Sequence, residues 1–482
     1  MNTFHMNRQQ RGTLAAAGLG FVVVLLDVSV VNVALEALRL RFHTDVAGLQ
    51  WVINAYTLTF AALLLTAGAL GDRYGARRVF ASGFTIFTLA SLACGSSPNL
   101  DLLIASRIVQ GLGAALLVPS SLTMLQQAFP VAAQRSRAVG WWGAAGGIAL
   151  AAGPVLGGIL VSHVGWRSIF LINLPIGVLG LMMTLRHVPI STTRPGRNLD
   201  IPGQILAVMA LASLTAALTQ AGRLGALHPL VYVGLAIFVL STLGFLWQES
   251  HSPAPMLPLS LFRSAMFSVA SVAGVIVNFA YYGLVFVFSL FFQTIQHLSP
   301  QQTGLAFLPM TAVLMVMNII AGRLIVRTGP RILMMAGLGL AALGYLLLLP
   351  ISADRPYWLL VIPMLVASSG IALTVPTMTN VTLSSVDPSR AGIASGVLNS
   401  ARQTGGMLGV AVFGFLVRDT AADLFMHGMH LCIATAVFLL LFGAILSFFG
   451  LKESGCPRQD GPPISPATSP SATSAIRRTS GT

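Results

Sequence analysis

Residues 68–78 read GALGDRYGARR, and this polar stretch separates two long apolar segments of the chain. Arginines at a helix end interact favourably with the helix dipole and with lipid headgroups, so the arginines alone have a structural explanation. The acid Asp72, four residues after Gly68 and followed by Gly75, is not explained in that way. A tight glycine turn would let the Asp72 carboxylate face a neighbouring helix end while the arginines reach lipid.

The composition on both sides of this stretch is that of an integral membrane protein. Of 482 residues, 55% are hydrophobic and only 8% are charged, whereas about 25% of residues are charged in a soluble domain. A membrane-spanning helix needs about 20 mostly apolar residues. The sequence therefore predicts an all-α protein with fourteen transmembrane helices, at residues 13–35, 48–70, 79–97, 101–124, 138–162, 166–186, 200–220, 229–248, 267–293, 303–325, 332–350, 356–377, 393–417 and 430–451.

The basic residues predict how the chain is oriented. The chain has 27 Lys and Arg against 13 Asp and Glu, and most of the basic residues fall in the even-numbered connectors and the two termini. The positive-inside rule then places both termini in the cytoplasm of a multi-pass protein of the inner or plasma membrane. Nearly all the basic residues are arginines in small groups between apolar runs, so the electrostatic footprint of a nucleic-acid partner is missing.

An internal repeat predicts the organisation of the helices. Gly68, Arg73, Gly75 and Arg77 recur at a constant offset as Gly322, Arg327, Gly329 and Arg331. Parallel repeats of helices are an architecture of membrane transporters. We expect a cytoplasmic N-terminus (1–12), an N-terminal six-helix bundle (13–190), two inserted helices (191–262), a C-terminal six-helix bundle (263–451) and a disordered cytoplasmic tail (452–482).

Asp27, Arg107 and Arg402 are charged residues inside predicted spans, where a charge is costly unless it is paired or hydrated. Asp27 must face a cavity, pair with another group or carry a proton, and a proton-coupling carboxylate has the same requirements. A static hydrogen bond to a neighbouring helix is the structural alternative. Arg107 has Gln110 close to its helix face. It could lie on a proton path, or its side chain could extend to the outer membrane surface.

Three motifs resemble those of the major facilitator superfamily. Residues 68–78 resemble its signature loop, which implies a conformational latch between the two halves of the fold. Residues 107–113 (RIVQGLG) are similar to its helix-4 motif, which places Arg107 in the proton path. Residues 153–158 (GPVLGG) are similar to the motif that marks exporters, although Ala149 replaces a glycine of the full pattern. The residues concerned are Gly68, Asp72, Arg73, Gly75, Arg77 and Arg78 for the latch, and Gly153, Pro154, Gly157 and Gly158 for a flexing antiporter helix.

Further stretches narrow the resemblance to one subfamily. Residues 26–35 (LDVSVVNVAL) resemble the first helix of the fourteen-helix drug:proton antiporters of the EmrB/QacA type, in which this aspartate is implicated in coupling or cation recognition. Residues 166–177 and 392–406 look like two other sequence hallmarks of this subfamily. The resemblance covers all fourteen helices. It implies a secondary transporter, not an enzyme, that exports drugs in exchange for protons, with the proton gradient as energy source and no cofactor.

Polar and aromatic residues within spans are candidates for lining a substrate cavity. The polar cluster at 399–403 could line this cavity or only bind helices together. The aromatic residues at 281–292 suit lipophilic drugs, but they could equally form a lipid-facing stripe or an aromatic belt. The candidates are Asn32, Gln110, Asn278, Tyr281, Asn399, Arg402 and Gln403. The three cysteines have no metal-ligand spacing, so no metal site is predicted.

The expected partners are a small-molecule substrate, protons and membrane lipid. One alternative is a transporter of the same fold dedicated to a single antibiotic, siderophore or metabolite. Another is a membrane-embedded sensor or enzyme subunit, which would need an extramembrane domain or a catalytic cluster that the sequence lacks. The sequence contains no phosphate-binding loop for ATP. It leaves open whether a periplasmic adaptor protein binds this chain.

Overall fold

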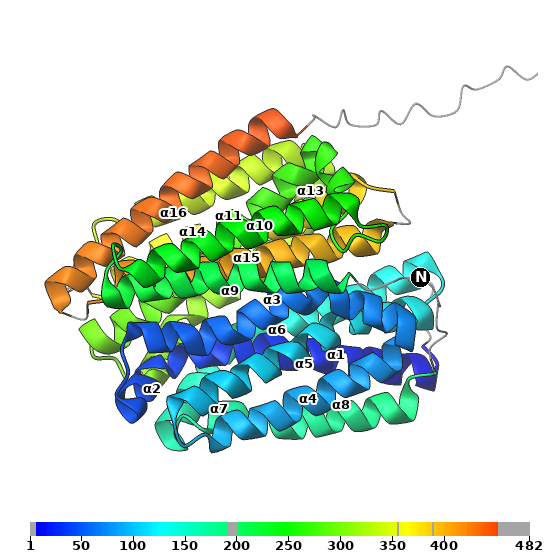
Figure 1. The fold of residues 1–482 in the computed structure, drawn as a ribbon, viewed down its shortest axis with the longest axis horizontal. Coiled ribbons are helices and arrows are strands. Elements are labelled where there is room, and N and C mark those ends of the chain that lie inside the picture. Colours follow the sequence, from blue (N-terminus) through cyan, green and yellow to red (C-terminus); the bar gives the residue numbers. More distant parts are fainter. Residues whose placement is uncertain (1–5, 191–199, 354–355, 388–389, 420, 452–482) are drawn as a thin grey trace, which may run out of the picture.

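The computed structural model describes residues 6–190, 200–353, 356–387, 390–419 and 421–451, and within these ranges the chain forms helices and no strands. The long helices run roughly side by side along one axis (Figure 1). The predicted tail at 452–482 lies outside the described residues. The helices are α1 (Arg8–Val33), α2 (Leu35–Phe42), α3 (Val46–Tyr74), α4 (Ala76–Ser96), α5 (Leu100–Ala128), α6 (Ala132–His163), α7 (Ser168–Leu171), α8 (Asn173–His187), α9 (Ile201–Leu224), α10 (Pro229–His251), η1 (Leu259–Arg263), α11 (Ala265–Leu290), η2 (Phe291–Ile295), α12 (Pro300–Ala306), α13 (Leu308–Leu346), α14 (Trp358–Ser384), α15 (Ala391–Leu416) and α16 (Ala422–Gly450).

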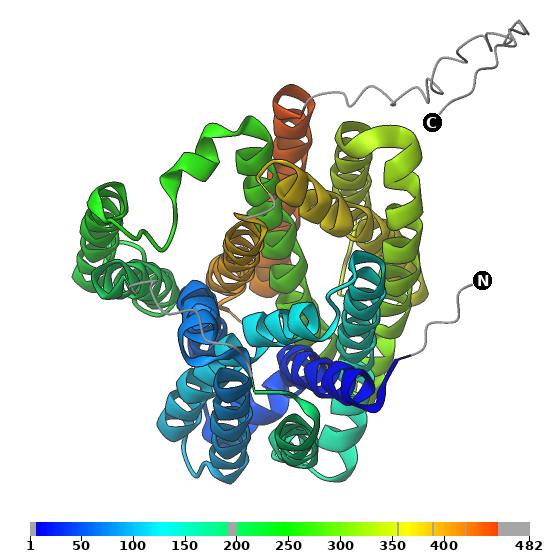
Figure 2. The same cartoon turned by 90° about the vertical axis from the view of Figure 1, so that its right-hand side faces the viewer.

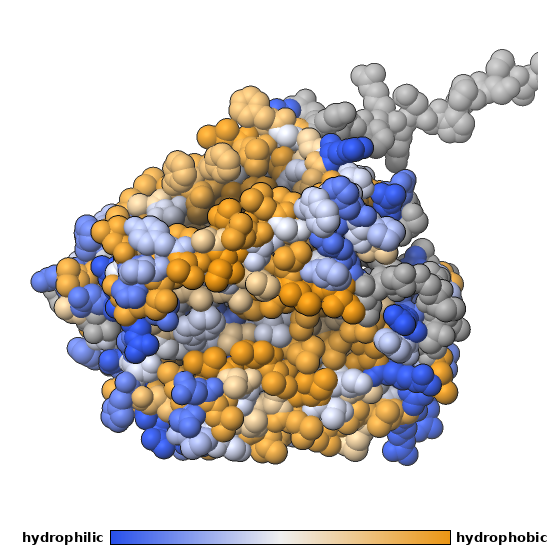
Figure 3. Space-filling model, in the orientation of Figure 1, coloured by the Kyte–Doolittle hydropathy of each residue, from blue (hydrophilic) through white to orange (hydrophobic). Residues whose placement is uncertain are grey.

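These helices confirm a multi-pass membrane protein. Thirteen of the described helices are long and apolar enough to cross a membrane. The helix α15 is also long, with 26 residues, and it occupies the place of the predicted span at 393–417. On the face drawn in Figure 3, apolar residues cover the middle of the molecule and hydrophilic residues gather toward its two ends. Most helix ends in the structure lie within a few residues of the predicted ends. The largest difference is at α16, which begins at Ala422 rather than at residue 430.

The sequence repeat has a counterpart in the backbone. Gly75 ends α3 with φ at 92°, and Gly329 breaks α13 with φ at 76°. Residues with a Cβ rarely adopt this region, so glycine is required at both turns. Gly329 divides α13 into two membrane-crossing segments, Pro300–Ile325 (with α12) and Arg327–Leu346. The repeated glycines therefore make the same kind of sharp turn after equivalent helices of the two halves.

The helices α1–α8 pack mainly against one another, and so do the helices α11–α16. The hairpin of α9 and α10 lies outside both groups (Figure 2) and contacts α3 and α15. The Gln204 amide of α9 donates to the backbone oxygen of Ala62 in α3 at 2.9 Å. Thr215 of α9 donates to the sulfur of Met407 in α15 at 3.2 Å. The hairpin is thus attached to one helix from each half.

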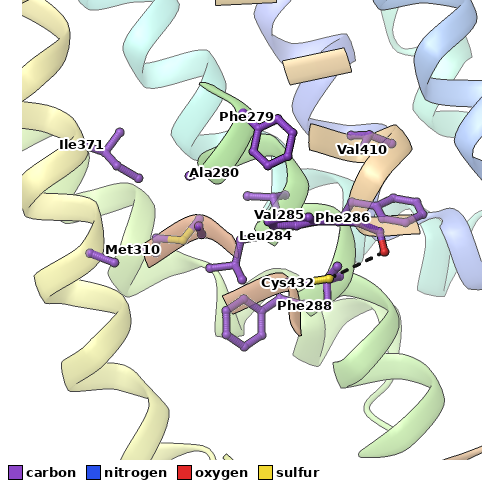
Figure 4. Close-up of a cluster of buried hydrophobic side chains, with 14 of the residues drawn as sticks. Phe279, Ala280, Leu284, Val285, Phe286, Phe288, Met310, Ile371, Val410 and Cys432 are labelled. Atoms are coloured by element: carbon purple, nitrogen blue, oxygen red, sulfur yellow. Dashed lines mark hydrogen bonds between the residues drawn. The ribbon is translucent and has the colours of Figure 1, made fainter. Parts of the chain in front are cut away.

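The C-terminal half of α11 lies in the core of the protein and not against lipid. Phe286 and Phe288 are fully buried in a cluster that includes Val410 and Cys432 (Figure 4). The thiol of Cys432 donates to the backbone oxygen of Phe413 at 3.7 Å. The lipid-facing alternative for the aromatic residues of this helix is therefore wrong for these two side chains.

The two halves are in close contact at the end opposite the chain termini. There α12 packs against α6, and the backbone nitrogen of Gln301 donates to the hydroxyl of Ser162 at 3.1 Å. Gln50 at the start of α3 donates to the backbone oxygens of Val410 and Ala411 at 2.9 and 2.8 Å. We call this region the closed end. Nearer the termini, Gly140 and Gly143 of α6 have no neighbour within 4 Å of a Cβ position.

Candidate functional site

Asp27 and Arg107 form an ion pair inside the N-terminal half. The Nη1 of Arg107 lies 2.5 Å from Oδ2 of Asp27, and the two side chains are 1% and 0% exposed. Pairing removes the cost that either charge would have alone in this apolar surrounding. Because Arg107 is enclosed, its side chain does not extend to the membrane surface, and that alternative is excluded.

Three uncharged polar side chains complete the surroundings of the ion pair. Gln110 accepts from Arg107 at 2.7 Å and donates to Oδ1 of Asp27 at 2.8 Å. Asn173 of α8 donates to the same oxygen at 2.9 Å. Ser91 of α4 accepts from Gln110 at 2.8 Å. The Asp27 carboxylate thus receives hydrogen bonds from α5 and α8.

The helix α3 covers the other side of the guanidinium. The Nε of Arg107 donates to the backbone oxygen of Val52 at 3.0 Å. The Cζ of Arg107 lies 4.2 Å from the ring centroid of Tyr56, which is a cation–π distance. The ion pair is therefore held by four helices that surround α1, and a change in its charge would alter contacts to all of them.

A cavity lies on the opposite face of α1, between the two halves. Its volume is about 10 Å³, which is room for about one water molecule. Ser29 and Asn32 of α1 line it, whereas Asp27 does not. Tyr281 of α11, a predicted cavity residue, also lines it. The other lining residues are Leu150, Pro154, Tyr282, Val285, Phe307, Met310 and Thr311. The proton-coupling candidate and the cavity thus lie on two faces of one helix.

The antiporter motif of α6 packs against both halves. A Cβ at Gly157 would lie 2.7 Å from Cγ2 of Val30 in α1, and one at Gly153 would overlap the hydroxyl of Ser29. A Cβ at Gly158 would lie 2.5 Å from the backbone oxygen of Pro300 in α12. The glycines therefore allow α6 to approach α1 on one side and the opposite half on the other.

The predicted latch residues lie at the end of the molecule that carries the termini. Asp72, Arg73 and Arg78 are exposed, and no ion pair found among the described residues includes Asp72. Arg77 donates to the backbone oxygen of Leu185 in α8 at 2.7 Å. In this conformation the arginine ties the loop to its own half, while the carboxylate does not contact the other half.

The polar cluster of α15 does not bind helices together through its amides. Asn399 donates to Ser395 of its own helix at 3.0 Å, and Asn278 of α11 similarly donates to Gly274 at 2.8 Å. Arg402 and Gln403 are partly buried. The link from this region to α3 comes instead from Ser400, which donates to the backbone oxygen of Ala61 at 3.0 Å.

The structure adds residues to the site that the sequence did not single out. Asn173 and Tyr56 contact the Asp27–Arg107 pair directly, and Ser91 accepts from Gln110, which bonds to both members of the pair. The sequence places Asn173 in the stretch 166–177, which resembles a hallmark of the subfamily but does not indicate a contact with Asp27. Its signal in the sequence is a polar residue within an apolar run, since a buried amide requires partners.

With this geometry in view, the chain can be compared with known proteins. The profile described as Major Facilitator Superfamily matches residues 17–410. The chain belongs to this superfamily. As a member, it is a membrane transporter for small molecules and not an enzyme. Transporters of this superfamily generally use ion gradients and need no bound cofactor.

Curated relatives in the superfamily are resistance and export proteins. The methylenomycin A resistance protein of Streptomyces coelicolor is 39% identical over 85% of this chain and 86% of its own length. The multidrug resistance protein Stp of Mycobacterium tuberculosis is 38% identical over 85% of this chain and 76% of its own length. The tetracenomycin C resistance and export protein of Streptomyces glaucescens is 34% identical over 86% and 77%.

Solved structures of more distant transporters share the fold. A D-xylose–proton symporter aligns with a TM-score of 0.68 at 14% identity, over 92% of this chain and 98% of the symporter. The second structure is that of a bacterial homologue of the human lysosomal transporter Spinster in an inward-facing conformation. It aligns with a TM-score of 0.65 at 15% identity, over 92% of this chain and 98% of the homologue. These alignments show the major facilitator architecture and nothing about substrate.

Proposed function

We propose that this protein exports drugs or other small amphipathic compounds in exchange for protons by alternating access. The observation that carries the proposal is Asp27 of α1, which is buried in an ion pair with Arg107 of α5 while another face of α1 lines the cavity between the halves. Such a carboxylate can exchange a proton when its surroundings change. The names of the relatives, which are resistance and efflux proteins, support export as the direction.

In this proposal the two six-helix bundles, 13–190 and 263–451, rock against each other, and the helices of 191–262 stay outside. The proton gradient supplies the energy. Both termini lie in the cytoplasm of the inner or plasma membrane, so the closed end faces outward and the structure is inward-facing. Gly153, Pro154, Gly157 and Gly158 let α6 flex and separate from α12 during the outward opening.

The direct test is transport in proteoliposomes under an imposed pH gradient. Purified protein is reconstituted with a panel of labelled antibiotics and dyes, and drug movement and internal pH are recorded together. We expect drug movement that depends on the pH gradient and a matching proton movement in the opposite direction. Drug movement that is indifferent to the gradient would contradict the coupling.

A dedicated exporter of one antibiotic, siderophore or metabolite is the second candidate. Two of the relatives are named for a single antibiotic, while Stp is named for multidrug resistance. A toxicity panel in an efflux-deficient host separates the two functions. Resistance to several unrelated compounds favours multidrug export, and resistance to one compound favours the dedicated exporter. Normal resistance in a host without periplasmic adaptors would show that no such partner is required.

The latch gives a testable prediction about conformation. We expect Asp72→Asn to slow transport about tenfold, because the carboxylate would contact the other half only in the outward-open state. The thermal stability of the Asp72→Asn variant in the present conformation should equal that of the wild type. The reason is that Asp72 is exposed here and no ion pair of the described residues includes it. The measurement is initial transport rate together with melting temperature, with the exposed Asp101→Asn as control. A variant that melts earlier but transports normally would contradict the latch.

A further inference from the structure

Arg402 lies in the middle of α15, on the side that packs against α11. Its Cγ lies 3.2 Å from the Cβ position of Gly274 in α11. Four residues further along α15, the Cβ position of Gly406 lies 2.8 Å from the ring of Tyr282, a cavity-lining residue. Residues four apart share a helix face, so Arg402 is on the face of α15 that meets Tyr282.

Among the residues that the structure describes, no carboxylate pairs with Arg402. None of the ion pairs among the described residues includes it, and its Nε is buried without a hydrogen-bond partner. The two buried acids of the described residues are engaged elsewhere. Asp27 is paired with Arg107, and Glu249 of the outer hairpin accepts from the backbone nitrogen of Leu257.

The cavity that Tyr282 lines has no charged side chain in its lining that could serve as the missing partner. Its lining consists of apolar side chains and of the neutral polar groups of Ser29, Asn32, Thr311 and the two tyrosines. Arg402 therefore gives this region a net positive charge. A cation inside a membrane span is costly unless it is paired or hydrated, so the site gains most from a ligand that carries a negative charge.

We propose that Arg402 binds a carboxylate or other oxyanion of the exported compound, with the aromatic body of the compound against Tyr281 and Tyr282. The inference rests on the proposed export function and specifies its substrate class. The guanidinium presents several N–H donors in a fixed plane, which suits two oxygens of one anionic group. A permanently cationic drug would meet repulsion at the same place.

The test compares two probes of the same shape, 2-naphthoate and the neutral 2-naphthamide, in equilibrium dialysis with the full-length protein in lipid nanodiscs. We expect the wild type to bind 2-naphthoate at least tenfold more tightly than 2-naphthamide. Arg402→Gln should abolish the preference, and Arg402→Lys should keep part of it because the charge remains. Arg418→Gln, the same change at an exposed position just after α15, is the matched control and should keep the preference.

Two results would overturn the inference. One is equal binding, or no binding, of the two probes by the wild type. The other is a preference for the anion that survives in Arg402→Gln. Because binding is measured without a pH gradient, the outcome is separate from proton-driven export. A protein that prefers the anion but does not couple its movement to protons loses the proposed function only, and a coupled exporter without the preference loses only this inference.

Discussion

Asp27→Asn is expected to abolish the exchange of drug for protons. The substitution removes the carboxylate that would bind and release the proton, while the amide keeps nearly the same shape. In proteoliposomes, drug added to one side should no longer move protons, so internal pH should stay constant. Exchange of labelled for unlabelled drug, which needs no net proton movement, should continue. Drug-driven proton movement at the wild-type rate would refute the coupling role of Asp27.

The ion pair adds a stability effect that the sequence alone did not suggest. Without the carboxylate, the Arg107 cation stays buried with no counter-charge, and breaking a buried pair in this way costs about 3–5 kcal/mol. The double variant Asp27→Asn/Arg107→Gln should recover much of this loss, because no uncompensated charge remains. It should still fail to couple. Thermal unfolding of both variants therefore separates a defect of folding from a defect of coupling.

Glu36→Gln is the matched control for this experiment. Glu36 pairs with Arg39 at 2.7 Å in α2, but the two side chains remain 16% and 28% exposed. An exposed ion pair contributes about 0–1 kcal/mol, so both stability and coupling should be close to wild type. If Glu36→Gln lost coupling as completely as Asp27→Asn, the effect would follow from any lost ion pair and not from a proton site.

Gly158→Ala is expected to have the second largest effect, through the closed end. Its Cβ would lie 2.5 Å from the backbone oxygen of Pro300 and 2.9 Å from Cα of Gln301. These are backbone atoms that cannot rotate away, so α6 and α12 must separate. Raising the free energy of the closed end by about 1.4 kcal/mol would lower its population tenfold relative to the open form. We expect transport to fall at least tenfold, because the cycle requires this end to close.

A cysteine in the cavity reports the conformation directly. Asn32→Cys, in a background without Cys456, should be inaccessible to a membrane-impermeant maleimide added at the closed end. The same cysteine should react once Gly158→Ala is added. Gly147→Ala is the control on the same helix, since a Cβ there meets no atom within 4 Å. Wild-type transport by Gly158→Ala would show that closure of this end tolerates the extra methyl group.

The sequence predicts the helices of this protein well because length and hydropathy determine them. Helix ends are less certain, since apolar composition fades gradually while the chain ends its helices with specific caps. Asp45 accepts from the backbone nitrogen of Gly48 and Asn99 from that of Leu102, so α3 and α5 begin before the strongly apolar residues. The glycines at 75 and 329 are visible in the sequence as part of the repeat, whereas the sharp turns that they make are seen only in the structure.

The assembly of the site was much harder to predict. Asp27 and Arg107 were each identified as costly charges, but nothing in the sequence indicated that they pair across 80 residues. In a membrane protein both lipid and protein are apolar, so periodicity does not reveal which side of a helix faces the core. For the same reason the sequence does not reveal that the Asn173 amide donates to the Asp27 carboxylate.

The helix α1 presents Asp27 to the interior of the N-terminal bundle and Ser29 and Asn32 to the cavity. A proton and a drug therefore do not compete for the same atoms, and one can influence the other only through α1 and its neighbours. Thermodynamic linkage makes such influence reciprocal. If protonation weakens drug binding by some factor, bound drug must weaken proton binding by the same factor. Measuring either one alone would then give the coupling free energy of the whole cycle.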